Sequence, residues 1–301
     1  MIITNIIGGL GNQMFQYAFH LYLKNNIKNE DKFFLDINQF ENYGLHNGYE
    51  LERIFSINEK YISKSLSLHN IVRNNILQSD ILKKVMIELS ISKINIFIED
   101  IYSLINLNNL NCKKEENYNY FIGYWQNYNY IKNNAEKIKN IFSFNLNKLD
   151  KNNKELLNNI ENNNSVSIHI RRGDYLNKNN FDKFANICNE KYYLNAINYI
   201  EKNIENPKYF VFSDDIEYCK YLFKEINNIF YVQNNKGKDS YWDMFLMSKC
   251  KHNIIANSSF SWWGAFLNSN NNKIVLAPNK WFNFDDISQN ILPKEWIKIE
   301  S

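Results

Sequence analysis

The stretch Ser165–Leu176, SVSIHIRRGDYL, joins an alternating apolar run to a cluster of charged residues. Its apolar residues stand at every second position: Val166, Ile168 and Ile170. A period of two is typical of a strand with one buried face, so the pattern predicts a strand that ends in a polar loop. The same alternation sends His169 and then Arg171 to one face of the strand, while Arg172 starts toward the other.

Two adjacent arginines at the end of this strand indicate a candidate anion site. Guanidinium forks match phosphate oxygens bidentately, and Gly173 permits a tight turn, so Arg171 and Arg172 together could clamp a diphosphate. The alternative for an isolated pair of arginines is a set of surface salt bridges. A third interpretation, that Arg172-Gly173-Asp174 is an adhesion signal, is weaker, because that tripeptide needs an exposed extracellular loop and this one adjoins a predicted buried strand.

The second half of the chain repeats the strand-loop-helix pattern three times. SVSIHI leads into RRGDYL, KYFVF leads into SDDIEYCKYLF, and HNIIA leads into NSSFSWWGAFLN. Strands that alternate with helices predict a parallel, doubly wound α/β sheet. Ligands of such sheets bind at the carboxyl ends of the strands, so the three polar loops are expected to converge on one site.

The second and third loops each carry polar residues with two interpretations. Ser213 and Asp214 could cap the next helix, or a carboxylate of Asp214 or Asp215 could accept hydrogen bonds from the N1 and N2 donors of guanine. A magnesium site at the paired aspartates ranks below both. In the third loop Asn257, Ser258 and Ser259 stand at an expected helix start, where hydroxyls and N–H groups can hold phosphate. Trp262 and Trp263 are expected to pack in the core.

The N-terminus predicts a further strand-loop-helix unit with a glycine-rich loop, IITNII-GGLGNQ-MFQYAFHLYLKNN. The loop lacks the third glycine of the dinucleotide fingerprint, which counts against a nicotinamide cofactor. Gly9 and Gly11 would let backbone approach a ligand, and the helix start attracts negative charge; a turn without a ligand is the alternative. Ile/Leu spacing predicts helix across Ser65–Leu107. A polar, Asn-rich stretch suggests two domains, residues 1–150 and 151–301.

Composition excludes several classes of protein. The chain of 301 residues is 45% hydrophobic and carries 35 basic against 32 acidic residues, which does not predict nucleic-acid binding. Its four cysteines show no zinc-ligand spacing, and no cofactor or metal is expected. We expect a cytoplasmic protein, because no signal peptide or membrane-spanning run is recognisable; peripheral contact with the inner face of the cell membrane is the alternative.

Taken together, five segments resemble the bacterial inverting α-1,2-fucosyltransferases of glycosyltransferase family 11. The segments are GGLGNQMFQYAF, GYWQNYNYI, HIRRGDY, FSDD and CKHNIIANSSFSWWGAFLN, which span most of the chain. Each is weakly diagnostic alone, and the ordered set is specific. The resemblance implies a GT-B-like α/β fold, with two Rossmann-like domains, an acceptor-side N-terminal domain, a GDP-fucose-binding C-terminal domain and the acceptor in the cleft between them.

The resemblance also implies an activity and the residues that perform it. L-Fucose would pass from GDP-β-L-fucose to the 2-hydroxyl of a terminal β-galactoside, free or lipid-linked, with inversion and without a metal, in O-antigen-type glycan synthesis. A different acceptor or linkage, or nucleotide-sugar binding without turnover, are the alternatives. The implied catalytic residues are Asn12, Arg171 and Asp174, although Asp174 could instead orient the arginines. The implied donor-binding residues are Gly9, Gly11, Asn12, His169, Arg171, Arg172, Asp214, Asp215, Asn257, Ser258 and Ser259.

Overall fold

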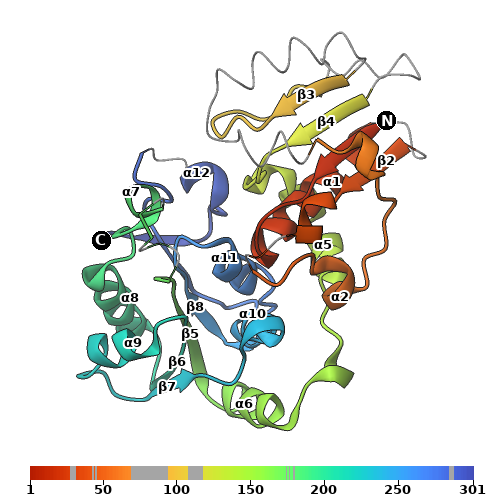
Figure 1. Ribbon diagram of the computed structural model, residues 1–301. Helices are drawn as coiled ribbons and strands as arrows, with labels where there is room; N and C mark the ends of the chain where they lie inside the picture. Colours follow the sequence, from red (N-terminus) through yellow and green to blue (C-terminus); the bar gives the residue numbers. More distant parts are fainter. Residues whose placement is uncertain are drawn as a thin grey trace. The chain divides into compact units, whose positions relative to one another are not determined.

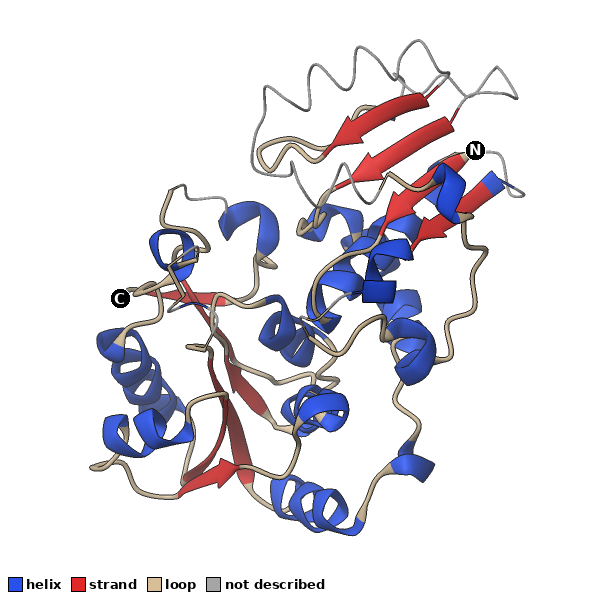
Figure 2. Cartoon of the chain, in the orientation of Figure 1, coloured by secondary structure: helices blue, strands red, loops and turns tan. Residues whose placement is uncertain are grey.

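The chain forms two compact units, Met1–Ile141 and Phe142–Ser301, in the computed structural model. Each unit is an α/β layer structure built on a parallel sheet (Figures 1 and 2). Among the residues that the structure describes, no helix is long and apolar enough to cross a membrane. The described residues are 1–27, 32–42, 44, 46–68, 94–107, 118–173, 175, 177–178, 180–284 and 288–301.

The first unit contains a four-stranded parallel sheet in the order β2-β1-β4-β3. Its strands are β1 (Ile2–Asn5), β2 (Phe33–Asp36), β3 (Ile94–Ile98) and β4 (Tyr118–Ile122). Its helices are α1 (Leu10–Asn26), α2 (Leu51–Phe55) and α5 (Ala135–Ile141), with single 3-10 turns η2 (Asn38–Asn42), η3 (Lys64–Leu66), η5 (Tyr128–Tyr130) and η6 (Lys132–Asn134). The predicted N-terminal strand, loop and helix are confirmed as β1, Ile6–Gly9 and α1.

The prediction of a helix across Ser65–Leu107 is wrong at residues 94–98, which form a strand. Residues 94–98 form β3, which pairs with β4 in register from Ile94 opposite Tyr118 to Ile98 opposite Ile122. Its isoleucines alternate, and sheet pairing with β4 overrides the helical spacing that the longer window shows. Residues 69–93 of the predicted helix lie outside the described residues.

The second unit contains a six-stranded parallel sheet in the order β10-β9-β8-β5-β6-β7. The strands are β5 (Asn164–Ile170), β6 (Pro207–Ser213), β7 (Ile229–Val232), β8 (His252–Ile254), β9 (Val275–Pro278) and β10 (Ile297–Ile299). The helices are α6 (Lys151–Glu161), α7 (Phe181–Phe184), α8 (Glu190–Asn203), α9 (Ile216–Leu222), α10 (Tyr241–Lys249), α11 (Ser259–Phe266) and α12 (Ser288–Ile291), with 3-10 turns η7 (Leu146–Lys148) and η9 (Gly237–Asp239).

This strand order is that of a dinucleotide-binding sheet, since the chain runs outward from β5 to β7 and then restarts on the other side of β5 with β8. Helices α8 and α9 cover one face of the sheet, and α6, α10 and α11 cover the other (Figure 1). The crevice expected for a ligand therefore lies at the carboxyl ends of β5 and β8, where the strand order reverses.

The alternation predicted for β5 is confirmed by what its side chains contact. The three apolar side chains are at most 1% exposed and pack in one core cluster with α8 and α9. On the opposite face, Ser165 Oγ accepts a hydrogen bond from the Lys251 amide at 3.1 Å, and Ser167 Oγ accepts one from Asn253 Nδ2 at 2.7 Å. Trp262 and Trp263 on α11 are fully buried, as predicted for core residues.

Candidate active site

Three polar loops of the second unit follow neighbouring strands. The loop after β5 begins at Arg171, the loop after β6 contains Asp214 and Asp215, and the loop after β8 reaches α11 at Ser259. Because β5 pairs in parallel with both β6 and β8, the three loops leave the same edge of the sheet. The sheet thus brings the loops to one edge, as the sequence predicts.

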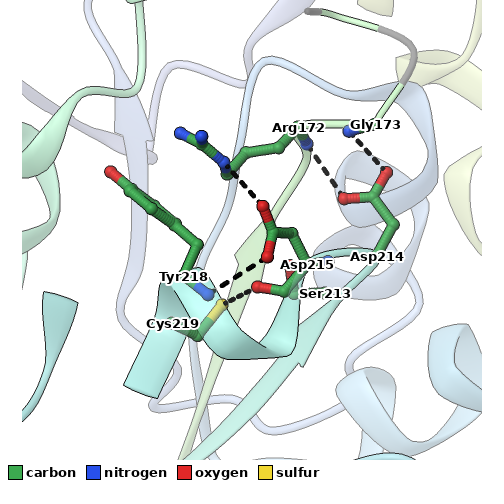
Figure 3. Close-up of polar contacts among 7 residues, drawn as sticks. All are labelled: Arg172, Gly173, Ser213, Asp214, Asp215, Tyr218 and Cys219. Carbon is green, nitrogen blue, oxygen red and sulfur yellow. Dashed lines mark hydrogen bonds and ion pairs between the residues drawn. The ribbon is translucent and has the colours of Figure 1, made fainter. Parts of the chain in front are cut away.

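Asp214 organises the start of the loop after β5. Its Oδ2 lies 2.9 Å from Arg171 Nη1, and its two oxygens accept the backbone N–H groups of Arg172 at 2.9 Å and Gly173 at 3.1 Å. Figure 3 shows the carboxylate facing these two amides. The side chains of Arg171 and Asp214 are 30% and 26% exposed, so this ion pair lies at the protein surface but is partly shielded from solvent.

Gly173 leaves room for the close approach of that carboxylate. A Cβ at this position would lie 2.8 Å from Asp214 Oδ2, so any other residue would push the carboxylate away. Arg172 and Gly173 of the tripeptide therefore belong to a loop that is tied to the end of β6. Asp174 itself lies outside the described residues.

Arg172 takes a different carboxylate partner from Arg171. Its Nε lies 3.1 Å from Asp215 Oδ2, and its guanidinium carbon lies 3.6 Å from the centroid of the Tyr218 ring (Figure 3). Asp215 Oδ1 also accepts the Tyr218 amide at 3.1 Å and so caps α9. The expectation that Ser213 and Asp214 cap this helix is wrong, because Asp215 reaches the free helix amide and Ser213 Oγ accepts the Asp215 amide.

The three candidate residues of the loop after β8 differ in their contacts and therefore in what they can do. Asn257 is 3% exposed, and its side-chain Nδ2 donates to the carbonyls of Phe184 and Trp281, both at 3.2 Å. Ser258 caps α11 in an extended conformation without a side-chain cap bond, and Ser259 is the first helical residue. Asn257 therefore fixes the loop, while Ser258 and Ser259 stand at the helix start, as predicted.

His169 lies at the end of β5 against α11. Its ring centroid is 5.8 Å from that of Phe260 in the first turn of α11, and its Nδ1 is buried without a hydrogen-bond partner. Burial, with a smaller contribution from the Arg171 charge, lowers the pKa of His169 to about 3. The ring is therefore neutral at ordinary pH, so one of its nitrogens donates a hydrogen bond and the other accepts one.

This buried histidine predicts a pH dependence of stability. The pKa is about 6.5 when unfolded and about 3 when folded, so between these values the unfolded chain binds a proton that the folded chain does not. The free energy of unfolding of the second unit should fall as the pH drops below about 6.5, by up to about 1.4 kcal/mol per pH unit from this residue. Urea titrations from pH 7 to 4 should show a shallower fall in His169→Gln; an unchanged slope would contradict the assignment.

The glycine-rich loop of the first unit is shorter than the sequence predicts, because α1 already begins at Leu10. Gly11 is buried inside the first turn of α1, and Gly8 has the positive φ of +79° that favours glycine. Gly9 caps α1 with no side chain, and its carbonyl accepts the amide of Asn12 at 3.0 Å. The loop before the helix therefore ends in Gly8, which is buried, and Gly9, which is partly buried, with Asn12 in the first helical turn.

Two buried glutamines that the sequence interpretation missed hold this loop. Gln13 Nε2 donates to the Gly8 carbonyl at 2.9 Å, and Gln16 Oε1 accepts the Ile7 amide at 2.8 Å. Both glutamines are fully buried among mostly apolar residues of α1. A polar residue on an apolar helix face must find a partner, and that pattern could have predicted them.

Solved structures of a fucosyltransferase share this fold. The crystal structure of the α-1,6-fucosyltransferase NodZ soaked with GDP-fucose aligns over 88% of this chain and 91% of its own, with 14% identity and a TM-score of 0.51. NodZ from Bradyrhizobium gives the same score at 12% identity, over 87% and 91% of the two chains. The architecture is therefore that of GT-B glycosyltransferases, with two Rossmann-like units, as predicted.

The sequence comparisons assign the family. The profile of glycosyl transferase family 11 matches residues 1–300, and the chain belongs to that family and is a glycosyltransferase. It is 35% identical to the Escherichia coli alpha-1,2-colitosyltransferase, over 100% of this chain and 99% of the relative. It is 34% identical to the E. coli O-antigen biosynthesis glycosyltransferase WbnK, over 97% and 98%.

Proposed function

We propose that this protein transfers a 6-deoxyhexose, L-fucose or its 3-deoxy analogue colitose, from a GDP-linked donor to the 2-hydroxyl of a terminal galactoside. The family and the full-length likeness to an alpha-1,2-colitosyltransferase support this linkage. The likeness to an O-antigen glycosyltransferase supports a bacterial surface glycan as the product.

The observation that carries the proposal is the arginine pair at the switch point of the second sheet. Arg171 and Arg172 leave β5 where a parallel α/β sheet binds its ligand, and both are held by carboxylates. In Figure 3 the terminal nitrogens of Arg172 point away from Asp215. Guanidinium groups so fixed suit the diphosphate of a nucleotide sugar, because their orientation is set before the ligand arrives.

The proposed mechanism is a displacement with inversion. The bond between the sugar C1 and the diphosphate breaks through an oxocarbenium-like transition state, while negative charge grows on the leaving GDP. Arg171 and the α11 start at Ser258 and Ser259 are proposed to stabilise that charge, and Asn12 and the Gly9 loop are proposed to contact the donor. The acceptor 2-hydroxyl attacks the opposite face of C1 and loses its proton. Asp174 stays a candidate base.

The sequence predicts that Asp214 or Asp215 reads guanine, but both carboxylates already have partners within the protein. Asp214 already accepts Arg171 and two backbone amides, and Asp215 accepts Arg172 and an α9 amide. We propose that Asp214 chiefly positions Arg171 and its loop. His169, neutral and adjacent to this loop, is proposed to contact the nucleotide.

The donor is tested by direct comparison of two nucleotide sugars. The purified chain is incubated with GDP-fucose or GDP-colitose, with lactose or another galactoside, and GDP release is measured with and without acceptor. A site that hydrogen-bonds the 3-hydroxyl of fucose should prefer fucose by about 10⁴-fold, whereas a site built for colitose should accept both.

Acceptor-dependent release of GDP is expected with at least one donor, and at the same rate in the presence of EDTA. Release with neither donor would contradict the proposal, and loss in EDTA restored by Mg²⁺ would contradict the metal-free prediction.

A further inference from the structure

The segment Gly123–Gln126, GYWQ, follows β4 at the switch point of the first sheet. In the order β2-β1-β4-β3, the chain moves from β1 to β2 at one edge, forms β3 at the other edge and then enters β4 beside β1. The carboxyl ends of β1 and β4 are therefore where this sheet would bind a ligand. The glycine loop follows β1, and the GYWQ segment follows β4, so the two lie together. The proposed function so far gives the GYWQ segment no role.

The GYWQ segment adopts a strained and specific conformation. Trp125 has a φ of +55°, which is rare and unfavourable for a bulky side chain. Its ring is 2% exposed and stacks on Phe19 of α1, with centroids 3.9 Å apart and planes 5° from parallel. A Cβ at Gly123 would lie 2.4 Å from Glu99 Cβ, so glycine is needed there. The surrounding packing thus holds a backbone shape that is unfavourable on its own.

Glu99 binds the backbone on both sides of Trp125. The residue directly follows β3, and its Oε2 accepts the Tyr124 amide at 2.7 Å while its Oε1 accepts the Gln126 amide at 3.1 Å. Burial raises the pKa of Glu99, and the hydrogen bonds from these amides act against that rise. The carboxylate thus fixes the point from which the Gln126 side chain extends.

The Gln126 side chain reaches the first turn of α1. Its Nε2 donates to Asn12 Oδ1 at 2.8 Å. With the carbonyl oxygen used in this way, the other end of the Asn12 amide, Nδ2, lies over the glycine loop, 2.9 Å from where a Cβ on Gly8 would stand. An amide whose carbonyl end is engaged presents N–H groups at its other end.

We infer that Gln126, with its backbone held by Glu99, is a positioning residue that orients the Asn12 amide so that Nδ2 donates to a phosphate oxygen of the leaving nucleotide. The inference rests on the proposed function, in which Asn12 serves the donor. The start of α1, a helix of 17 residues, favours negative charge at the same place. Asn12 is thus proposed to act as a hydrogen-bond donor whose direction is set by Gln126, in the segment that follows β4.

A double-mutant cycle tests the inference on transfer. Gln126→Glu keeps the size of the side chain but removes its donor, and should lower kcat about 10-fold with KM nearly unchanged, because the lost donor acts on charge that develops in the transition state. Gln126→Leu should behave alike. Adding Gln126→Leu to Asn12→Ala should change kcat less than about 2-fold, since the two residues act as one unit. Multiplied losses, or full activity of both Gln126 variants, would overturn the inference.

The matched control is Asn129→Ala, three residues after Gln126 in the chain. Asn129 Nδ2 donates to Asn127 Oδ1 at 2.9 Å, so this variant also removes a local amide bond, but one that does not involve Asn12. Its kcat should stay within about 2-fold of the parent value. A loss equal to that of Gln126→Leu would assign the effect to general loosening of the segment and overturn the inference.

A second measurement needs no substrate and separates this inference from the proposed function. In Asn12→Asp, the Gln126 donor should stabilise the ionised carboxylate, so its pKa, followed by carboxyl NMR titration, should be lower than in Asn12→Asp/Gln126→Leu by about 1 unit. Equal pKa values in the two variants would show that Gln126 does not contact residue 12, and would overturn the inference. If no GDP-sugar is turned over, the proposed function fails, and this titration still decides whether Gln126 positions residue 12.

Discussion

Replacing Arg171 with alanine is expected to lower kcat by about 10²-fold or more. The guanidinium is held by Asp214 at the carboxyl end of β5, so its charge is oriented before the diphosphate begins to leave. Removal of one such preorganised donor typically costs about 10²–10³-fold in turnover. Arg171→Lys should recover only part of the loss, because an ammonium keeps the charge without the bidentate fork. Initial rates of GDP release, with circular dichroism to confirm folding, measure the effect.

The control for this variant is Lys220→Ala on α9. Lys220 pairs with Glu217 at 2.7 Å in an exposed ion pair on the helix that follows the Asp214 loop. An exposed pair contributes little, so activity should stay within about 2-fold. Near-full transfer by Arg171→Ala would remove the diphosphate role assigned to this residue.

Asp214→Asn is expected to lower kcat by about 10–10²-fold without changing which base the enzyme prefers. The substitution removes the charge that holds Arg171 and weakens the bonds to the Arg172 and Gly173 amides. A misplaced catalytic group can cost up to about 10²-fold. GDP-fucose and IDP-fucose should lose rate equally, because the inosine base lacks only the 2-amino group. A loss confined to the guanine donor would show that Asp214 reads the base instead.

Asp215→Asn is the matched comparison for Asp214. Asparagine caps a helix about as well as aspartate, so the bond to the Tyr218 amide should survive while the ion pair with Arg172 is lost. We expect a smaller loss, below about 10-fold. An equal loss in the two variants would contradict the separate roles given to the two carboxylates.

Much of the second unit follows from its sequence because short-range pattern and long-range placement agree there. Alternating Val166, Ile168 and Ile170 require a strand, and a polar loop after each parallel strand must lie at the same edge of the sheet. The choice between Asp214 and Asp215 as helix cap could not be predicted. The two aspartates are adjacent and identical, so no sequence pattern distinguishes them. Only the backbone direction after β6 decides which one reaches the Tyr218 amide.

The first unit was harder to predict because its contacts join distant residues. Gln126 meets Asn12 only because β4 inserts beside β1, a pairing across more than 100 positions that no local pattern encodes. Gly123 and Trp125 likewise take their conformations from Glu99 and Phe19. In a chain rich in asparagine and isoleucine, composition also obscured which amides are buried and which are surface residues.

The most direct test of the account is the structure of the transfer product. The chain is incubated with lactose and the GDP-linked sugar that it uses, and the product is analysed by NMR for linkage position and anomeric configuration. The expected product carries an α-linked 6-deoxyhexose on O2 of galactose, formed with inversion from the β-linked donor. Attachment at another galactose oxygen, or a product that retains the β configuration, would contradict it.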